Sequence, residues 1–314
     1  MSKPTTDFAG LAHLLPEAHV GQVQKIQPIP MGLSGAAVFS VTSTRGELVL
    51  RVQPGGEAEP WEQQLRILSR AAERGLAPAL VHVDPSARAT VSTRVMGAPL
   101  AAALADAGQR GAMMADLVSR LRELHALEVD GLTERDPLAL AQSQWALQRE
   151  RPGFPQWASA LESNFAAIAV TLARDPRRVV SHNDLNPSNI LWDGTRTWLV
   201  DWEVAGLTHP FYDLAVLSMF LRLDDATALS LLTMQEQRPV DDAGREVFAA
   251  LRRLAALLCG LTFASLVPDL NLLPATAPTL VECYAGLRAG TLNLREPEGR
   301  GFFALALLQL GMER

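Results

Sequence analysis

The chain has 314 residues, of which 48% are hydrophobic, so it can bury the core of one large domain or two modest ones. Its net charge is −6, which excludes a general nucleic-acid or anionic-membrane binder because such proteins need a basic field. Two cysteines, Cys259 and Cys283, cannot form a disulfide framework or a zinc site by themselves. No signal sequence is recognised, and the longest apolar run, residues 254–267, is short for a membrane span. We therefore expect a cytoplasmic protein with neither a nucleic-acid nor a membrane partner.

Hydrophobic alternation dominates the first third of the chain. It predicts four strands, at residues 36–42, 47–52, 80–83 and 90–95. Between the second and third strands, Leu65, Leu68 and Ala72 recur at helical spacing before Gly75, which predicts a helix over residues 61–74. The order strand, strand, helix, strand, strand predicts a small antiparallel sheet with one helix packed on it, an α+β lobe.

The pattern becomes helical after Pro99. Leucines at three- and four-residue steps predict a helix over residues 112–127, and similar periodicity continues to the end of the chain. One short hairpin interrupts the helices, with strands at residues 190–192 and 198–200 around an Asp-Gly turn. We expect a boundary near residue 97, with an N-terminal part of residues 1–97 and a C-terminal part of residues 98–314.

Polar residues flank this hairpin on both sides. His182, Asp184 and Asn189 precede it, and Asp201 follows it. Because the returning strand runs back toward the start of the hairpin, the last three can converge at one end of it. Two carboxylates and a carboxamide are hard oxygen ligands suited to Mg²⁺ that is also held by phosphates. One carboxylate would remain free to accept a proton.

Three motifs carry a family resemblance: SHNDLNPSNIL, then LVDWE, then PFYDLA. The chain resembles the aminoglycoside phosphotransferase and choline kinase family, which has a bilobal, α+β protein-kinase-like fold. The resemblance implies an N-terminal nucleotide-binding lobe over residues 1–97 and a C-terminal catalytic and substrate-binding lobe over residues 98–314. It also implies an ATP-dependent kinase that phosphorylates a hydroxyl group of a small molecule by direct in-line transfer. The alternative is a non-catalytic nucleotide-binding scaffold, which the intact acidic motif disfavours.

The resemblance implies a role for each motif residue. Asp184 is the catalytic carboxylate that orients and deprotonates the acceptor hydroxyl. Asn189 and Asp201 hold Mg²⁺ bound to the phosphates of ATP, or of GTP. His182 braces the catalytic loop, and Asp213 ties the following helix to that loop.

The N-terminal lobe carries the implied nucleotide contacts. Gly32, Ser34 and Gly35 precede a strand, where the family has its phosphate-covering loop, and glycines permit close backbone approach. Val95 and Met96 belong to the segment that would present backbone groups to the adenine edge.

Arg51 stands at the position of the phosphate-binding lysine of protein kinases, where a guanidinium also gives charge-assisted bonds to phosphate. The next helix should offer a glutamate to brace it. The expected position falls on Gln64, with Glu62 two residues away. Residues two apart differ by about 200° around a helix, so one of them at most can face Arg51. We favour Glu62 on chemical grounds.

The acceptor is the least determined feature. His-Asn-Asp resembles choline, ethanolamine and thiamine kinases, and an aromatic cage for a quaternary ammonium could include Trp202 with Glu203 nearby. Val204 stands where choline kinases typically carry tyrosine, so choline is possible but not favoured. An antibiotic such as an aminoglycoside would need many carboxylates, in which the distal C-terminal part is not rich, and a neutral or apolar hydroxyl compound fits as well. Trp145 and Trp157 are either acceptor contacts or helix-packing residues. A monomer and a homodimer are both open.

Overall fold

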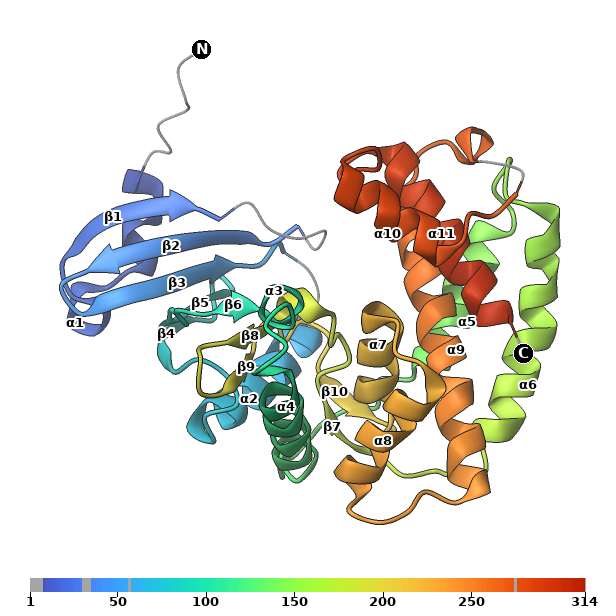
Figure 1. Cartoon of the computed structure of the whole chain (residues 1–314). Helices are drawn as coiled ribbons and strands as arrows, with labels where there is room; N and C mark the ends of the chain where they lie inside the picture. The colour runs from blue at the N-terminus through green and yellow to red at the C-terminus, as the bar shows by residue number, and fades with distance from the viewer. Residues whose placement is uncertain (1–7, 30–34, 56–57, 274–275, 314) are drawn as a thin grey trace. The chain divides into compact units, whose positions relative to one another are not determined.

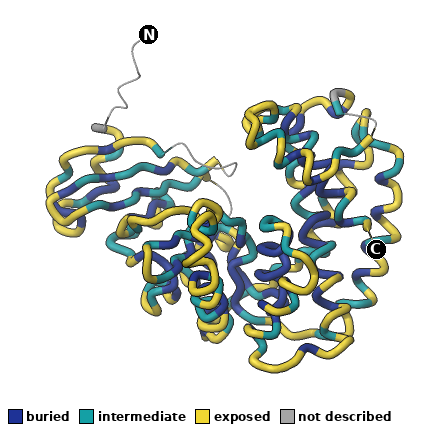
Figure 2. The backbone as a smooth tube through the Cα atoms, in the orientation of Figure 1, coloured by how far each residue is buried: buried dark blue, intermediate teal, exposed yellow. Residues whose placement is uncertain are grey.

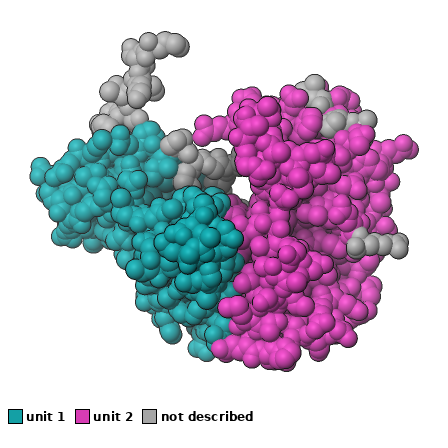
Figure 3. Space-filling view, viewed as in Figure 1, with its two compact units in different colours: residues 1–132, 188–205 teal, residues 133–187, 206–314 magenta. Residues whose placement is uncertain are grey.

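A computed structural model describes residues 8–29, 35–55, 58–273 and 276–313 of the chain. Its contacts divide the chain into two compact units. Unit 1 comprises residues 1–132 and 188–205, and unit 2 comprises residues 133–187 and 206–314 (Figure 3). The chain therefore crosses between the units more than once, and the segment 188–205 belongs to unit 1 although unit 2 precedes and follows it.

Unit 1 is built on an antiparallel sheet of five strands in the order β1-β2-β3-β5-β4 (Figure 1). The strands are β1 (Val23–Pro28), β2 (Ala37–Ser43), β3 (Gly46–Val52), β4 (Leu80–Asp84) and β5 (Ala89–Thr93). The four predicted strands are all present, whereas β1 was missed. In β1 only Ile26 is buried, so the strand lacks the apolar alternation that identifies the others.

One hydrophobic cluster holds this sheet. Val41, Leu48 and Leu50 from β2 and β3 are buried in it, and they pack with residues that precede the sheet. Those residues lie in a 3₁₀ turn (Phe8–Leu14), in the loop after it and in the short helix α1 (Glu17–Val20). A fully buried aliphatic side chain contributes about 1.5–3 kcal/mol, so this cluster fixes the position of β3 within the sheet.

The remaining elements of unit 1 are helices and a small three-stranded sheet. They are α2 (Ala58–Glu73), β6 (Ala98–Pro99), α3 (Leu100–Ala103), α4 (Arg110–His125), β8 (Ile190–Trp192) and β9 (Thr197–Leu199). The hairpin β8–β9 pairs with β6, and Thr197 donates two hydrogen bonds, from its N–H and its hydroxyl, to Asp116 Oδ2 on α4 at 2.7 and 2.6 Å. These contacts group α4 and the hairpin with the first sheet, so unit 1 extends beyond the boundary predicted at residue 97.

Unit 2 is mainly helical. Its strands are β7 (Val179–Ser181) and β10 (Gly206–Thr208), and its helices are α5 (Pro137–Gln148), α6 (Leu161–Leu172), α7 (Tyr212–Leu221), α8 (Asp225–Glu236), α9 (Asp242–Ser265), α10 (Leu280–Ala289) and α11 (Pro297–Met312). Short 3₁₀ turns cover Gln156–Ala160 and Leu270–Leu272, and a third, Pro187–Asn189, leads into β8. The two strands pair antiparallel, with Gly206 opposite Ser181.

Helix α9 is the centre of unit 2 and packs against α5, α6, α7 and α11. Two glycines let α11 approach it closely: a Cβ on Gly260 would lie 2.9 Å from Leu308 Cγ, and one on Gly311 would lie 2.6 Å from Leu257 Cγ. Among the described helices, α9 alone is long and apolar enough to cross a membrane, yet 61% of its most apolar window is buried inside the protein (Figure 2). That burial is typical of a core helix.

Candidate functional site

A buried carboxylate fixes the loop that follows β7. Asp213, at the start of α7, is fully buried and accepts hydrogen bonds from the backbone N–H groups of His182 (3.1 Å) and Asn183 (2.8 Å). Asn183 has a φ of +67°, a left-handed conformation that asparagine adopts more readily than most residues. Because the two amides bind one carboxylate, the loop backbone is tied to the first turn of α7.

Asp184 comes next on this loop, and its side chain is partly exposed. Its backbone N–H donates to Nδ1 of the buried His182 at 3.4 Å. Burial raises the pKa of the Cys259 thiol to about 12, and the negative charge of Asp184 acts in the same direction. Burial and, to a smaller degree, the charges of Cys259 and Asp184 also raise the pKa of Tyr212. Asp184 therefore lies within electrostatic reach of Cys259 and Tyr212, two protonated side chains that were not among the predicted site residues.

Two further motif residues lie at one end of the β8–β9 hairpin in unit 1. Asn189 is buried immediately before β8, and its carbonyl accepts a hydrogen bond from the Val200 N–H at 2.9 Å. Asp201 follows directly, with a φ of +67° that turns the chain away from β9. The structure thus brings these two residues to the same end of the hairpin, as the spacing predicts. Among the described residues, no group of three or more His, Cys, Asp or Glu side chains gathers as a metal site.

Arg51 in β3 joins this end of the hairpin. Its Nη2 donates to Asp201 Oδ1 at 2.9 Å and also to the carboxylate of Glu203. The three side chains are 16%, 17% and 23% exposed, respectively. The ion pairs are therefore partly shielded from water, which makes them stronger than a surface pair.

The helix residue expected to brace Arg51 does not do so in this structure. Glu62 is exposed on α2, and Gln64 is buried on the inward face, where Gln53 Nε2 donates to its Oε1 at 2.8 Å. The prediction that Glu62 rather than Gln64 faces inward was therefore wrong. The rotation of α2 about its own axis is set by the burial of its apolar face, and that rotation turns Gln64 inward and Glu62 outward. Sequence reasoning had also assigned Glu203 to the acceptor, and its bond to Arg51 was missed because the two residues are 152 positions apart.

The other predicted nucleotide contacts are less defined. Gly32 and Ser34 lie outside the described residues. Gly35 is exposed with a φ of +76°, and a Cβ added to it would meet no atom of the described residues within 4 Å. Strand β5 ends at Thr93, so Val95 and Met96 lie on the segment beyond it. Val95 is half-buried and Met96 is 69% exposed.

The tryptophans proposed as acceptor contacts differ in their surroundings. Trp202 is only 3% exposed and its Nε1 donates to the Leu199 carbonyl at 3.0 Å, so its indole is part of the core rather than the wall of a cage. Trp145 is buried and packs edge-on against Phe154, with ring centroids 5.4 Å apart. Trp157, in the 3₁₀ turn before α6, is half-buried.

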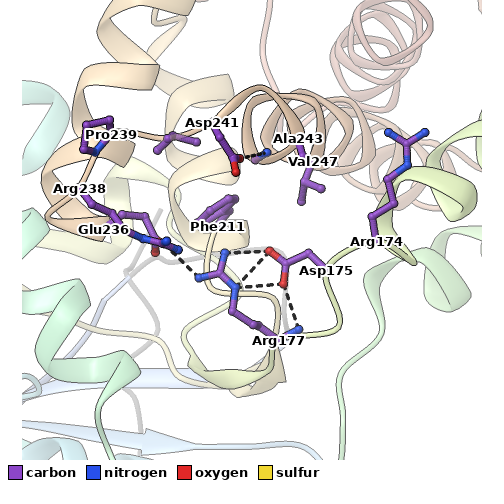
Figure 4. A pocket seen from close by; sticks show the side chains of 12 residues that line it. Arg174, Asp175, Arg177, Phe211, Glu236, Arg238, Pro239, Asp241, Ala243 and Val247 are labelled. Carbon is purple, nitrogen blue, oxygen red and sulfur yellow. Dashed lines mark hydrogen bonds and ion pairs between the residues drawn. The ribbon is translucent and has the colours of Figure 1, made fainter.

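Unit 2 also contains a pocket of about 230 Å³ with a charged floor (Figure 4). Arg177 donates to Asp175 at 2.8 Å and to Glu236 at 3.0 Å, and His209 Nε2 lies 3.1 Å from Asp175 Oδ2. Burial lowers the pKa of His209 to about 4 despite the attraction of Asp175. None of the predicted site residues that the structure describes lines this pocket, whose three arginines are balanced by three acids. Its lining residues are Arg174, Asp175, Arg177, Phe211, Glu236, Arg238, Pro239, Val240, Asp241, Ala243, Gly244 and Val247.

Comparison with protein-family models identifies the family to which the chain belongs. Residues 25–248 match the phosphotransferase enzyme family. Since the match spans more than half of the chain, the protein belongs to this family, and the predicted family resemblance is confirmed. No curated protein matches the chain.

Solved structures with similar folds come from two groups of small-molecule kinases. A choline/ethanolamine kinase family protein from Mesorhizobium loti has a TM-score of 0.66 at 20% identity, over 91% of this chain and 93% of that one. The choline kinase LicA from Streptococcus pneumoniae has a TM-score of 0.63 at 19% identity, over 81% and 87%, and LicA is also known in complex with AMP. The GDP complex of aminoglycoside 2'-phosphotransferase-IIIa has a TM-score of 0.65 at 16% identity, over 98% of both chains. The predicted α+β, protein-kinase-like fold is confirmed.

Proposed function

We propose that the protein is a small-molecule kinase that transfers the γ-phosphoryl group of ATP or GTP directly to a hydroxyl group of its acceptor. The observation that carries this proposal is the loop bearing Asp184, which is fixed by Asp213 on one side and continues over five residues to the buried Asn189. A fixed loop presents a carboxylate in one orientation, and positioning is most of what phosphoryl transfer requires of a protein. Membership of the phosphotransferase family supports the same reaction class.

In this proposal each residue of the chain has a defined task. Asp184 accepts a hydrogen bond from the acceptor hydroxyl and receives its proton as the new phosphate ester forms. Arg51 supplies charge-assisted hydrogen bonds to phosphate oxygens. Val95 and Met96 lie where backbone groups would bind the base.

The oxygen ligands fit a magnesium ion. Asn189 supplies a carboxamide oxygen and Asp201 a carboxylate oxygen at one end of the hairpin, and Mg²⁺ in nucleotide sites takes few protein ligands and completes its shell with phosphates and water. When bound, the ion would neutralise the charge of the nucleotide phosphates. The hydrogen bond from Arg51 Nη2 to Asp201 Oδ1 holds that carboxylate at this end of the hairpin.

The acceptor belongs to the class of small hydroxyl compounds. The similar structures are choline or ethanolamine kinases and an aminoglycoside phosphotransferase, which differ in acceptor. Here Trp202 is in the core and Glu203 is bound to Arg51, so neither is available for a quaternary ammonium group. These placements favour a neutral hydroxyl compound over choline. Trp145 and Trp157 stay predicted contacts, and a cytoplasmic monomer or homodimer stays the expectation.

Two measurements on the wild-type protein test the proposal. Thermal denaturation with ATP and with GTP, each with and without Mg²⁺, should show stabilisation that depends on the metal. Phosphorylated product should then be detected by mass spectrometry across a panel containing choline, ethanolamine, thiamine, aminoglycosides and neutral alcohols. Metal-dependent nucleotide binding without turnover on any panel member, or ATP hydrolysis alone, would favour the scaffold alternative.

A further inference from the structure

Arg51 is held by two carboxylates that follow β9. Its position in the sheet is fixed on both sides, since it pairs with Val38 in β2 and with Thr90 in β5. The side chain is largely buried, and its Nε has no hydrogen-bond partner among the residues that the structure describes. The direction in which the guanidinium points is therefore decided by Asp201 and Glu203, its two partners through Nη2.

Helix α2 does not provide an acid for this purpose. Its three glutamates, Glu59, Glu62 and Glu73, are all exposed. The buried polar positions of the helix carry amides instead: Gln64 accepts from Gln53, and Gln63 donates to the Ala205 carbonyl at 3.4 Å. An uncharged amide cannot neutralise a guanidinium, so the charge of Arg51 is balanced from the other strand segment.

The segment that carries the two acids is anchored along its length. Trp202, between Asp201 and Glu203, is buried and bonded through Nε1 to the Leu199 carbonyl. The N–H of the buried Ala205 donates to the Trp202 carbonyl at 3.1 Å. These bonds fix the backbone from which both carboxylates extend toward Arg51.

We propose that Glu203 is the positioning residue of Arg51, replacing an acid on the sheet-packing helix, and that it governs nucleotide binding rather than acceptor binding. The inference rests on the proposed function, because it assigns Glu203 a task within that site. It moves Glu203 from the acceptor, where the sequence had placed it, to the phosphates of the nucleotide.

Charge balance explains why two acids are needed. In the proposed site Asp201 also faces a divalent cation, and a cation and a guanidinium compete for one carboxylate. Glu203 retains Arg51 when Asp201 is engaged by the metal, so the guanidinium stays directed at the phosphates. Without Glu203, the guanidinium of Arg51 would stay hydrogen-bonded to Asp201 and would compete with the metal ion for that carboxylate.

Three variants at one position test this assignment: Glu203→Gln removes the charge, Glu203→Asp keeps it, and Glu203→Ala removes the whole group. Affinity for the nucleotide with Mg²⁺ is measured by calorimetry, and the acceptor KM is measured separately. We expect Glu203→Gln to lose about ten- to 100-fold in nucleotide affinity, as for one charged hydrogen bond, with the acceptor KM unchanged. Glu203→Asp should retain most of the affinity. The matched control is Glu47→Gln, which breaks the exposed pair of Glu47 with Arg94 in the same sheet.

A second measurement needs no nucleotide. Urea denaturation of Arg51→Gln, Glu203→Gln and the double variant forms a double-mutant cycle, and contacting residues should give losses of stability that do not add. Additive losses would overturn the contact. Two outcomes would overturn the assignment of Glu203 and leave the proposed function standing. In the first, the wild type binds nucleotide and Glu203→Gln changes only the acceptor KM. In the second, Glu62→Gln shows the loss of nucleotide affinity that is expected of Glu203→Gln. A wild-type protein that binds neither ATP nor GTP would overturn the proposed function, and the inference with it.

Discussion

Two aspartates near the motif are used in opposite ways. Asp213 in unit 2 is fully buried, and its two oxygens accept hydrogen bonds from the backbone N–H groups of His182 and Asn183 in the loop after β7. Asp201 in unit 1 is partly exposed, and the hydrogen bond to its side chain comes from another side chain, the guanidinium of Arg51. A carboxylate that holds two backbone amides cannot turn toward a ligand without releasing the loop, whereas a carboxylate paired with a side chain can exchange that partner for a metal. The contacts of Asp213 are therefore structural, and those of Asp201 leave it able to take part in the proposed metal site.

Of the variants that test the difference between Asp201 and Asp213, Asp201→Ala should have the largest effect, on the affinity for nucleotide. It removes a proposed metal ligand, so the affinity for nucleotide in the presence of Mg²⁺ should fall more than about 100-fold, beyond the loss typical of a residue that merely supports a ligand. The fold should persist, because the side chain is partly exposed and outside the core. Calorimetric titration and circular dichroism measure the two properties. Normal binding of the metal nucleotide would show that Asp201 is not a ligand.

Asp213→Asn should instead affect stability. The amide keeps one acceptor oxygen but turns an NH₂ group toward a backbone N–H, which leaves a buried donor unsatisfied. We expect the free energy of unfolding to fall by about 3 kcal/mol, measured by urea denaturation. The comparison variant is Asp201→Asn, which should lose about 1 kcal/mol, because Arg51 keeps its ion pair with Glu203. Equal losses for the two variants would remove the distinction between them.

Burial of His209 in unit 2 should also make the free energy of unfolding depend on pH. His209 has a folded-state pKa of about 4, below the usual value of about 6.5, so the unfolded chain binds more protons between these pH values. Its contribution is fully present above pH 6.5 and is lost as the pH falls toward 4, by about 3 kcal/mol. Denaturation curves of the wild type and His209→Gln at several pH values measure this. Parallel pH profiles for the two proteins would contradict it.

The sequence predicted the features that repeat at regular spacing. Four strands of the first sheet, the helices and the β8–β9 hairpin follow from periodicity and turn chemistry, because burial of one face imposes the pattern. The motif also placed Asn189 and Asp201 at one end of the hairpin, since two paired strands bring their outer ends together. Strand β1 was not predicted, because it has a single buried residue, Ile26, and therefore no alternation of apolar and polar residues.

Long-range partners could not be predicted. The bond between Arg51 and Glu203 joins residues 152 apart, and whether Glu62 or Gln64 faces inward depends on how α2 packs. Trp202 lies next to two motif acids, yet burial of its indole is decided by the core beneath the hairpin rather than by its neighbours in sequence. Such tertiary choices override what local sequence suggests about a side chain.

The most direct test of the account is the Asp184→Asn variant, assayed for phosphoryl transfer with an acceptor that the wild type uses. The substitution keeps the size and one oxygen of the side chain but removes its charge and basicity. Loss of general-base assistance should lower kcat by about 10²–10⁴-fold, with the affinity for the metal nucleotide nearly unchanged. Asp242→Asn, at an exposed position of α9, is the matched control and should behave as wild type. An Asp184→Asn protein that keeps most of its transfer rate would contradict the proposed role of this carboxylate and with it the mechanism.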